Sequence, residues 1–172
     1  MTPEEKQNIF DLIENRITAE EFLRRWGAAR SEASKLGLGI LEKAYRTKAA
    51  GDVSFGLYLA FHFGVTAEYF DVLCKLADEE WHKSHEDVVW ALDGLRDKRA
   101  IDVFVRAALK LHPYLAYDDT RALASKALYA LANLADPDAD ERLRWLSQSD
   151  DPVVKEEAVR QLQYRGLTRS HE

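Results

Sequence analysis

The chain has 172 residues, and its 8 Gly and 4 Pro make the two helix-breaking types scarcer than the ~12% usual in proteins. With 47% hydrophobic residues it can bury a substantial core, which excludes disorder for most of its length. The single cysteine, Cys74, excludes an internal disulfide framework and a zinc ribbon. No apolar run approaches the ~20 residues of a membrane span and the N-terminus lacks the pattern of a secretory signal, so a cytoplasmic protein with no membrane partner is expected.

The net charge of −6 is unevenly distributed. Residues 1–50 contain 9 Lys and Arg against 8 Asp and Glu, whereas residues 51–172 contain 15 against 22, a net charge of −7. A nucleic-acid binder needs a basic surface to displace counterions from phosphates, so this balance argues against nucleic acid as a partner. A basic protein is the more natural complement, because opposite fields accelerate encounter. The local basic excess over residues 24–48 is either a contact for an acidic partner or phosphate backbone, or an ordinary solvated face.

The first 50 residues predict three helices, over residues 3–16, 18–27 and 31–48. Pro3 suits the first position of a helix. Thr18 followed by Glu21 has the pattern of a capping box. The third helix contains Gly37 and Gly39, which we expect to permit close packing against another helix.

From Gly51 onward the sequence repeats, and helix starts recur at spacings of 32, 36 and 31 residues, at Asp52, Ser84, Thr120 and Asp151. In that register the apolar residues of each unit's first helix superimpose: Leu59, Ala60 and Phe63; Ala91, Leu92 and Leu95; Ala127, Leu128 and Leu131; Ala158, Val159 and Leu162. Second helices are expected over residues 67–78, 99–111 and 138–146. The spacing therefore predicts helical pairs stacked in series.

Residues 120–139 (TRALASKALYALANLADPDA) and 151–162 (DPVVKEEAVRQL) resemble HEAT repeats. In that family an Asp-x-x-Val-(Arg/Lys) start leads into an Ala/Leu helix, an Asp-Pro turn and a second helix. The resemblance is good over residues 84–165, looser over 52–83 and absent over 1–50. The second unit departs from it, because Asp97 is followed by Lys98 where the family pattern has proline.

This resemblance implies an all-α fold, a short α-solenoid of HEAT-like helical pairs in an α-α superhelix. We expect one domain over residues 1–172, composed of an N-terminal helical segment (1–50), three to four repeats (51–165) and a frayed tail (166–172). Each pair in such a fold contacts its neighbours, and stacking creates an extended binding surface.

Candidate residues for chemistry have simpler structural explanations. Cys74 falls on an apolar stripe and is expected to be a buried structural thiol. His62, between two phenylalanines, is expected to be a packed core histidine. His82 and His85 lie among acidic residues, but the predicted cap Ser84 separates them at a helix start, so no metal site is expected. No catalytic motif is present, and we predict no catalytic residue, cofactor or metal.

Many carboxylates are explained as helix caps, because they lie at predicted helix starts: Asp52, Glu86, Asp87, Asp119, Asp136, Asp138 and Asp151. Since the second helices of HEAT solenoids line the concave side, the resemblance makes their polar and aromatic residues candidate partner contacts. These are Asp71, Lys75, Asp102, Arg106, Glu141 and Trp145. The alternative is a solvated face with i,i+4 ion pairs.

Two further features are candidate contacts for a protein partner. The longest repeat contains an enlarged connection, residues 111–119 (LHPYLAYDD), in which Tyr114, Tyr117 and Asp118 combine aromatic and acidic groups as protein interfaces do. Alternatively, the two tyrosines fill a gap between repeats. Trp90 lies off the apolar stripe beside Asp93, so it either packs against a neighbouring unit or presents its face to a basic partner.

In size, acidic bias and the stretch YLAYDDTRALA (residues 114–124), the chain is similar to bacterial HEAT-like immunity proteins of polymorphic or contact-dependent toxin systems. That resemblance implies a non-catalytic protein-binding module, monomeric when free, that covers the active site of a basic toxin domain. Two alternatives stay open. One is a scaffold or adaptor for an endogenous complex, and the other is a HEAT-like enzyme of the alkylpurine DNA glycosylase or phycobilin lyase type, although a glycosylase needs a basic groove.

Overall fold

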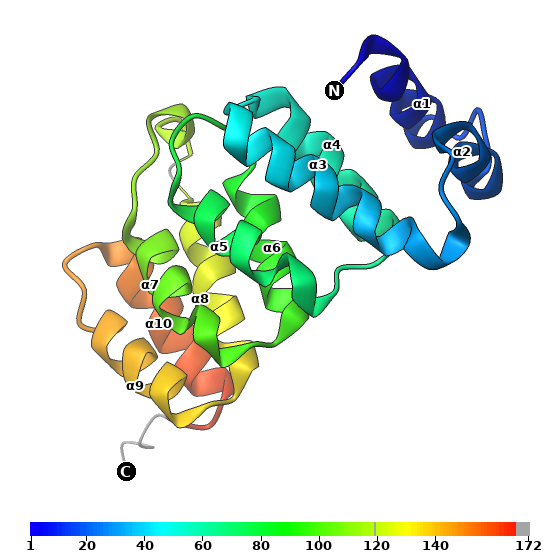
Figure 1. Cartoon of the computed structure of the whole chain (residues 1–172). Helices are drawn as coiled ribbons and strands as arrows, with labels where there is room; N and C mark the ends of the chain where they lie inside the picture. Colours follow the sequence, from blue (N-terminus) through cyan, green and yellow to red (C-terminus); the bar gives the residue numbers. More distant parts are fainter. Residues whose placement is uncertain (119, 168–172) are drawn as a thin grey trace. The chain divides into compact units, whose positions relative to one another are not determined.

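A computed structural model describes residues 1–118 and 120–167, which form ten α-helices, four short 3-10 turns and no strand (Figure 1). The helices are, in chain order, α1 (Pro3–Ile13), α2 (Ala19–Trp26), α3 (Ala33–Thr47), α4 (Ala50–Phe63), α5 (Phe70–Asp78), α6 (His85–Leu95), α7 (Ile101–Leu109), α8 (Ala122–Leu134), α9 (Pro137–Leu146) and α10 (Pro152–Tyr164). The all-α prediction is confirmed. Asp119, expected as a cap, and residues 168–172 of the expected tail lie outside the described residues.

The helix boundaries follow from capping. The Thr2 hydroxyl accepts a hydrogen bond from the backbone N–H of Glu5, and the Glu5 carboxylate accepts one from the backbone N–H of Thr2, so α1 begins with a full capping box. At α2 only half of the predicted box forms. Thr18 accepts from the Glu21 N–H, but the Glu21 carboxylate binds Arg24 and Arg25 instead.

Among the described residues no helix has both the length and the apolar character needed to cross a membrane. The chain divides into two compact units, Met1–Val72 and Leu73–Glu172, with the boundary inside α5. The expectation of one domain, with repeats starting at residue 51, stays a prediction.

In the first unit α3 packs along α4, and α1 packs on α2. A core of aliphatic and aromatic side chains joins these helices: Ile9, Leu12, Phe22, Leu23, Ala33, Ile40 and Leu59. Gly37 lets α3 approach α4 closely, because a Cβ at this position would lie 2.6 Å from the Gly56 carbonyl oxygen and 2.7 Å from the Tyr69 hydroxyl. A Cβ on Gly39 would meet nothing within 4 Å, so the expectation that Gly39 also serves close packing is wrong.

Tyr69 uses the space beside Gly37. Its hydroxyl donates to the Ser34 carbonyl oxygen at 2.5 Å and accepts from the Leu38 N–H at 2.9 Å. Burial raises the pKa of Tyr69 to about 12. A fully buried phenol thus satisfies two backbone groups of α3, as burial of a polar group requires.

Asp52 differs from its predicted role as a cap. The helix α4 begins at Ala50, so Asp52 lies in the first turn and is 5% exposed. Its carboxylate accepts from the α-amino group of Met1 at 2.8 Å and lies 2.9 Å from Lys6 Nζ. These two cations compensate the charge of a buried carboxylate and lower its pKa, although burial opposes that shift.

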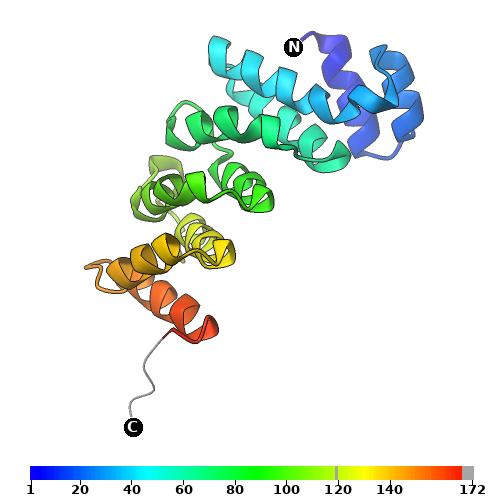
Figure 2. The same ribbon diagram turned by 60° about the horizontal axis from the view of Figure 1, so that its bottom comes forward.

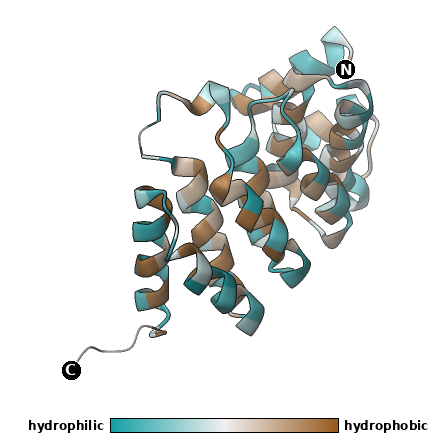
Figure 3. Ribbon diagram, turned by 90° about the vertical axis from the view of Figure 1, so that its left-hand side faces the viewer, coloured by the Kyte–Doolittle hydropathy of each residue, from teal (hydrophilic) through white to brown (hydrophobic). Residues whose placement is uncertain are grey.

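The second unit consists of two rows of helices (Figure 2). One row contains α6, α8 and α10, the other contains α7 and α9, and α8 packs on helices of both rows. Apolar residues recur on every helix, with hydrophilic residues between them (Figure 3). The first helices predicted to start at Ser84 and Thr120 start at His85 and Ala122, and the second helices predicted over 99–111 and 138–146 are observed over 101–109 and 137–146. This neighbour-to-neighbour packing is that of a solenoid-like fold.

Candidate protein-binding surface

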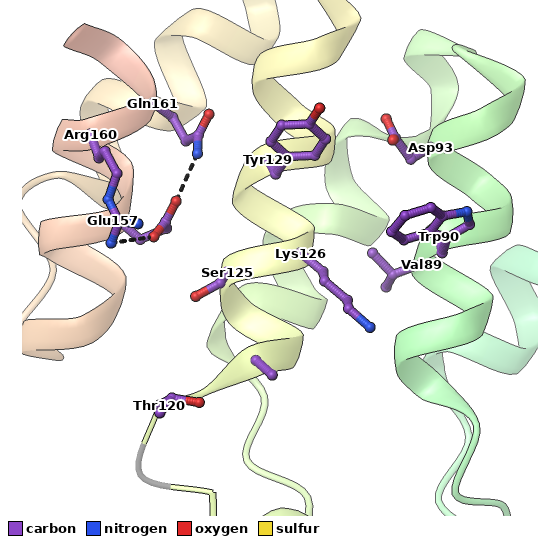
Figure 4. A pocket seen from close by; sticks show the side chains of 11 residues that line it. Val89, Trp90, Asp93, Thr120, Ser125, Lys126, Tyr129, Glu157, Arg160 and Gln161 are labelled. Atoms are coloured by element: carbon purple, nitrogen blue, oxygen red, sulfur yellow. Dashed lines mark hydrogen bonds and ion pairs between the residues drawn. The ribbon is translucent and has the colours of Figure 1, made fainter. Parts of the chain in front are cut away.

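A groove of about 640 Å³ crosses the row formed by α6, α8 and α10 (Figure 4). Its lining comes from these three helices and the segment before α8: Val89, Trp90, Asp93, Thr120, Ala122, Ser125, Lys126, Tyr129, Glu157, Arg160 and Gln161. The volume is within the range of sites that hold a ligand or an anchoring side chain of a partner.

Two large aromatic side chains in this groove are exposed to solvent. Trp90 on α6 is 63% exposed and Tyr129 on α8 is 51% exposed. Tryptophan and tyrosine are enriched among residues that dominate the binding energy of protein interfaces. Neither side chain is needed to fill the core, which Val88, Leu92 and Leu128 form beneath them. Both rings are therefore exposed on the same groove.

Polar contacts hold together two of the helices that line the groove, α6 and α8. Lys126 Nζ on α8 lies 2.7 Å from Glu86 Oε2 on α6, and the Asn133 side-chain amide donates to both carboxylate oxygens of Asp93 at 3.1 Å. Both contacts join α6 to α8. Side chains held in this way are pre-organised, so a partner pays less conformational entropy on binding.

The other wall of the groove contains a buried carboxylate. Glu157 on α10 is 5% exposed. The Gln161 side chain donates to Glu157 Oε1 at 2.7 Å, and Arg160 lies 2.7 Å from Oε2, as drawn in Figure 4. A buried acid with both oxygens occupied is a structural element of the wall, which leaves the exposed Arg160 guanidinium as the polar group at the rim.

The repeat register accounts for the groove. In the alignment of Ala91, Ala127 and Ala158, the residue before each alanine is Trp90, Lys126 and Glu157, and the residue two positions after it is Asp93, Tyr129 and Arg160. All six line the groove. Equivalent positions in stacked helices fall on one face. Sequence reasoning missed the four residues on α8 and α10 because it used the register for the core alone.

The predicted partner contacts lie on several helices and in one connection. Trp90 and Asp93 line the groove. The residues predicted from the second helices lie elsewhere and are exposed: Asp71 and Lys75 on α5, Asp102 and Arg106 on α7, and Glu141 and Trp145 on α9.

Several of these exposed residues form ion pairs on the row that contains α7 and α9, called the second-helix row below. Arg106 donates two hydrogen bonds of 2.8 Å to the Asp78 carboxylate, and Asp102 lies 3.4 Å from Arg142. Such contacts agree with the alternative of a solvated, ion-paired face. Trp145 is different, because it is 55% exposed and shares a small hollow with Leu109.

The three predicted contacts in the enlarged connection, Tyr114, Tyr117 and Asp118, have different surroundings. Tyr114 is half-buried and its hydroxyl lies 2.8 Å from His85 Nδ1, so it fills space as the alternative interpretation holds. Tyr117 is 82% exposed. The Asp118 carboxylate accepts from the backbone N–H groups of Thr120 and Ala122. Hydrogen bonds from the Thr120 hydroxyl and these N–H groups lower the pKa of Asp118, so its carboxylate is engaged by the backbone that leads into α8.

One of the histidines singled out in the sequence differs from expectation. His62 is exposed and contacts the rings of Tyr58 and Phe63, so the prediction of a core histidine is wrong. His82 and His85 do flank the start of α6, yet both are 1% exposed and their rings stack with centroids 4.3 Å apart. Within residues 1–118 and 120–167 no three His, Cys, Asp or Glu side chains gather as a metal site. Cys74 is half-buried on α5.

No protein family, curated protein or solved structure matches this chain.

Proposed function

We propose that the chain is a non-catalytic protein-binding module that holds its partner in the α6–α8–α10 groove. The observation that carries this proposal is the exposure of Trp90 and Tyr129 in one groove, at 63% and 51%. Aromatic anchors in a pocket with a charged rim are the usual composition of a binding hot spot. The Lys126–Glu86 ion pair and the Asn133–Asp93 hydrogen bond join α6 to α8, the helices that carry Trp90 and Tyr129.

The proposed partner is a protein surface rich in lysine and arginine. Residues 51–172 carry a net charge of −7, which attracts a basic partner and raises its association rate. At the groove itself Trp90 lies beside Asp93. A lysine or arginine of the partner can place its charge over the indole face and near this carboxylate.

Within this class we propose an immunity protein with HEAT-like repeats, which neutralises a toxin domain by covering its basic active site. The resemblance of residues 84–165 to HEAT repeats and the acidic surplus support this more specific assignment. The mechanism is steric and electrostatic, since a substrate phosphate and the acidic module compete for the same basic surface.

Affinity capture with matched variants tests the binding site. Wild-type protein, the double variant Trp90→Ala/Tyr129→Ala and the control Tyr164→Ala are used as baits in a lysate of the source cell. Tyr164 is 83% exposed on α10 but does not line the groove. A partner identified by mass spectrometry should bind the wild type and the control and should be lost with the double variant. Equal capture by all three baits would contradict the proposal.

Growth rescue separates an immunity protein from an endogenous adaptor. When the captured partner is expressed alone, a toxin arrests growth and co-expression of the wild-type chain restores it. The Trp90→Ala/Tyr129→Ala variant should fail to restore growth. A captured partner whose expression is harmless would refute the immunity assignment and leave the binding module intact.

A further inference from the structure

Three histidines of the second unit form a buried stack outside the groove. The centroids of the His82 and His85 rings are 4.3 Å apart and those of His85 and His112 are 3.8 Å apart. The exposed fractions of the three side chains are 1%, 1% and 4%. Tyr114 extends the stack, with its ring 5.6 Å from that of His85. The stack thus joins the turn between α5 and α6 to the connection before α8.

The hydrogen bonds of His82 and His85 assign neutral imidazoles. His82 Nε2 lies 2.8 Å from the Leu76 carbonyl oxygen, so it carries the proton, and Nδ1 accepts from the Ser84 N–H at 3.1 Å. His85 Nε2 lies 2.7 Å from the Glu79 carbonyl oxygen and likewise donates. Its Nδ1 is then free to accept from the Tyr114 hydroxyl at 2.8 Å. In each ring as described, one nitrogen donates and the other accepts; in His82 the accepting nitrogen faces a backbone N–H, which the doubly protonated ring cannot accommodate.

We propose that this three-histidine stack is an acid-sensitive clasp, which holds residues 111–118 against the turn between α5 and α6 at neutral pH and releases them when its imidazoles take up protons. The geometry gives two reasons. A proton on His82 Nδ1 would point at the backbone N–H of Ser84, a donor that cannot turn away. Two protonated rings 3.8 to 4.3 Å apart would repel each other in a buried site.

His85 and His112 connect the stack to the moving segment. The Tyr114 hydroxyl can rotate and accept from a protonated His85, so this hydrogen bond alone does not resist acid. The resistance comes from burial, which lowers the pKa of His85 to about 4, with the neighbouring His82, His112 and Lys110 adding to the shift. His112 Nε2 is buried without a hydrogen-bond partner. A proton added to this nitrogen would find no acceptor in the folded segment, whereas water would accept from it once residues 111–118 open.

Several charged groups lie around the histidine stack, and each affects the pKa values of the histidines less than burial does. The carboxylate of Glu79 favours a proton on His82 but is outweighed by burial, which lowers the pKa of His82. Glu80 lies 3.2 Å from Lys110 Nζ, and Glu86 lies 2.7 Å from Lys126. Two further groups, Asp87 and Tyr117, face Tyr114 and act on that phenol. Glu80 and Glu86 are thus paired with lysines, and Glu79 is half-buried.

Hydrogen exchange tests the clasp directly and does not depend on the proposed binding function. Exchange of peptides covering residues 110–122 is measured at pH 7.0 and pH 5.0, with exchange times scaled for the intrinsic rate. We expect these peptides to open about tenfold more at pH 5.0, while peptides of α3 and α4 change less. An identical pH response in both regions would overturn the proposal.

Two variants and one titration make the test specific. His112→Phe keeps a stacked ring and removes one titrating group, so it should reduce the acid-induced opening, whereas His62→Gln at an exposed site should leave it unchanged. If His112→Phe does not fold, the imidazole NMR signals of the wild type decide. Signals of His82, His85 and His112 whose titration midpoints lie clearly below the ordinary value support the clasp. Midpoints near the ordinary value of 6.5 would refute it.

Discussion

Trp90 and Tyr129 belong to different repeats, yet they line the same groove because α6 and α8 are neighbours in one row. The two side chains are exposed at 63% and 51%, whereas their neighbours Val89, Ala91, Leu128 and Ala130 are buried. This relationship places the candidate binding surface on the first helices of the repeats. The second helices, which the HEAT resemblance favours, carry ion pairs over much of their exposed face.

Replacement of Trp90 and Tyr129 by alanine should leave the fold intact. Both side chains are more than half exposed, so their loss removes little buried apolar area, and each single variant should change the free energy of unfolding by less than about 1 kcal/mol. Urea unfolding followed by far-UV circular dichroism measures this. A loss of several kcal/mol would mean that the rings serve packing and are not free for a partner.

The two glycines of α3 should respond oppositely to alanine. In Gly37→Ala the new Cβ would meet the Gly56 carbonyl oxygen at 2.6 Å and the Ala60 nitrogen at 2.8 Å, so α3 must move away from α4. We expect a loss of about 2 kcal/mol or more. Gly39→Ala meets nothing within 4 Å and should stabilise α3 by about 0.5–1 kcal/mol. Thermal unfolding of both variants compares them, and equal effects would contradict the close approach at Gly37.

Tyr69→Phe should destabilise the first unit. The phenylalanine ring fills the same space but leaves the Leu38 N–H without its acceptor and the Ser34 carbonyl oxygen without its donor. An unsatisfied buried backbone group costs about 1–3 kcal/mol. Chemical unfolding of the variant measures this loss, and wild-type stability would show that water reaches these groups.

Asp151 should contribute more to stability than its neighbour Asp150. The Asp151 carboxylate accepts from the Val153 and Val154 N–H groups at the start of α10 and forms an ion pair with Arg121. Asp151→Ala should therefore cost about 1–2 kcal/mol. Asp150 is exposed, so Asp150→Ala is the matched control and should be neutral. Similar melting temperatures for both variants would rule out the capping role.

Acid should lower the stability of the second unit between pH 7 and pH 5. Burial lowers the pKa of His85 to about 4 from its ordinary value of 6.5, so in that range the unfolded chain binds a proton that the folded chain does not. Stability is then fully present above pH 6.5 and falls as the pH decreases, by at most about 1.4 kcal/mol per pH unit for each such histidine. Urea unfolding at pH 7 and pH 5 measures it, and a flat profile in this range would exclude buried neutral histidines.

The sequence predicts the helices well because their boundaries depend on local chemistry. Thr2, Thr18, Asp136 and Asp151 each accept hydrogen bonds from the first turn of a helix. The repeat spacing also predicts the helical pairs, since each pair needs a similar length of chain. The helix α8 begins at Ala122, two residues after the predicted start at Thr120, and its N-cap Arg121 has a positive φ of 53°.

The sites were harder to predict because they depend on contacts between distant residues. Nothing in the sequence of their own helices marks Tyr129 or Glu157 as a groove residue. Their position in the groove becomes predictable only when their repeats are aligned with the repeat that contains Trp90. The histidine stack needs the path of residues 111–118, which brings His112 onto His85. No local pattern encodes that path. Gly37 and Gly39 are likewise indistinguishable until α4 is placed against one side of α3.

The most direct test of the proposed site is calorimetric titration of the purified partner, once captured. It compares one variant in the row of α6, α8 and α10 with one variant in the row of α7 and α9. Trp90→Ala should weaken binding by about thirtyfold or more, as expected for an aromatic hot spot. Trp145→Ala, which removes an exposed tryptophan of the second-helix row, should change Kd by less than about threefold. A large loss with Trp145→Ala and wild-type affinity with Trp90→Ala would contradict the groove and place the partner on the second helices.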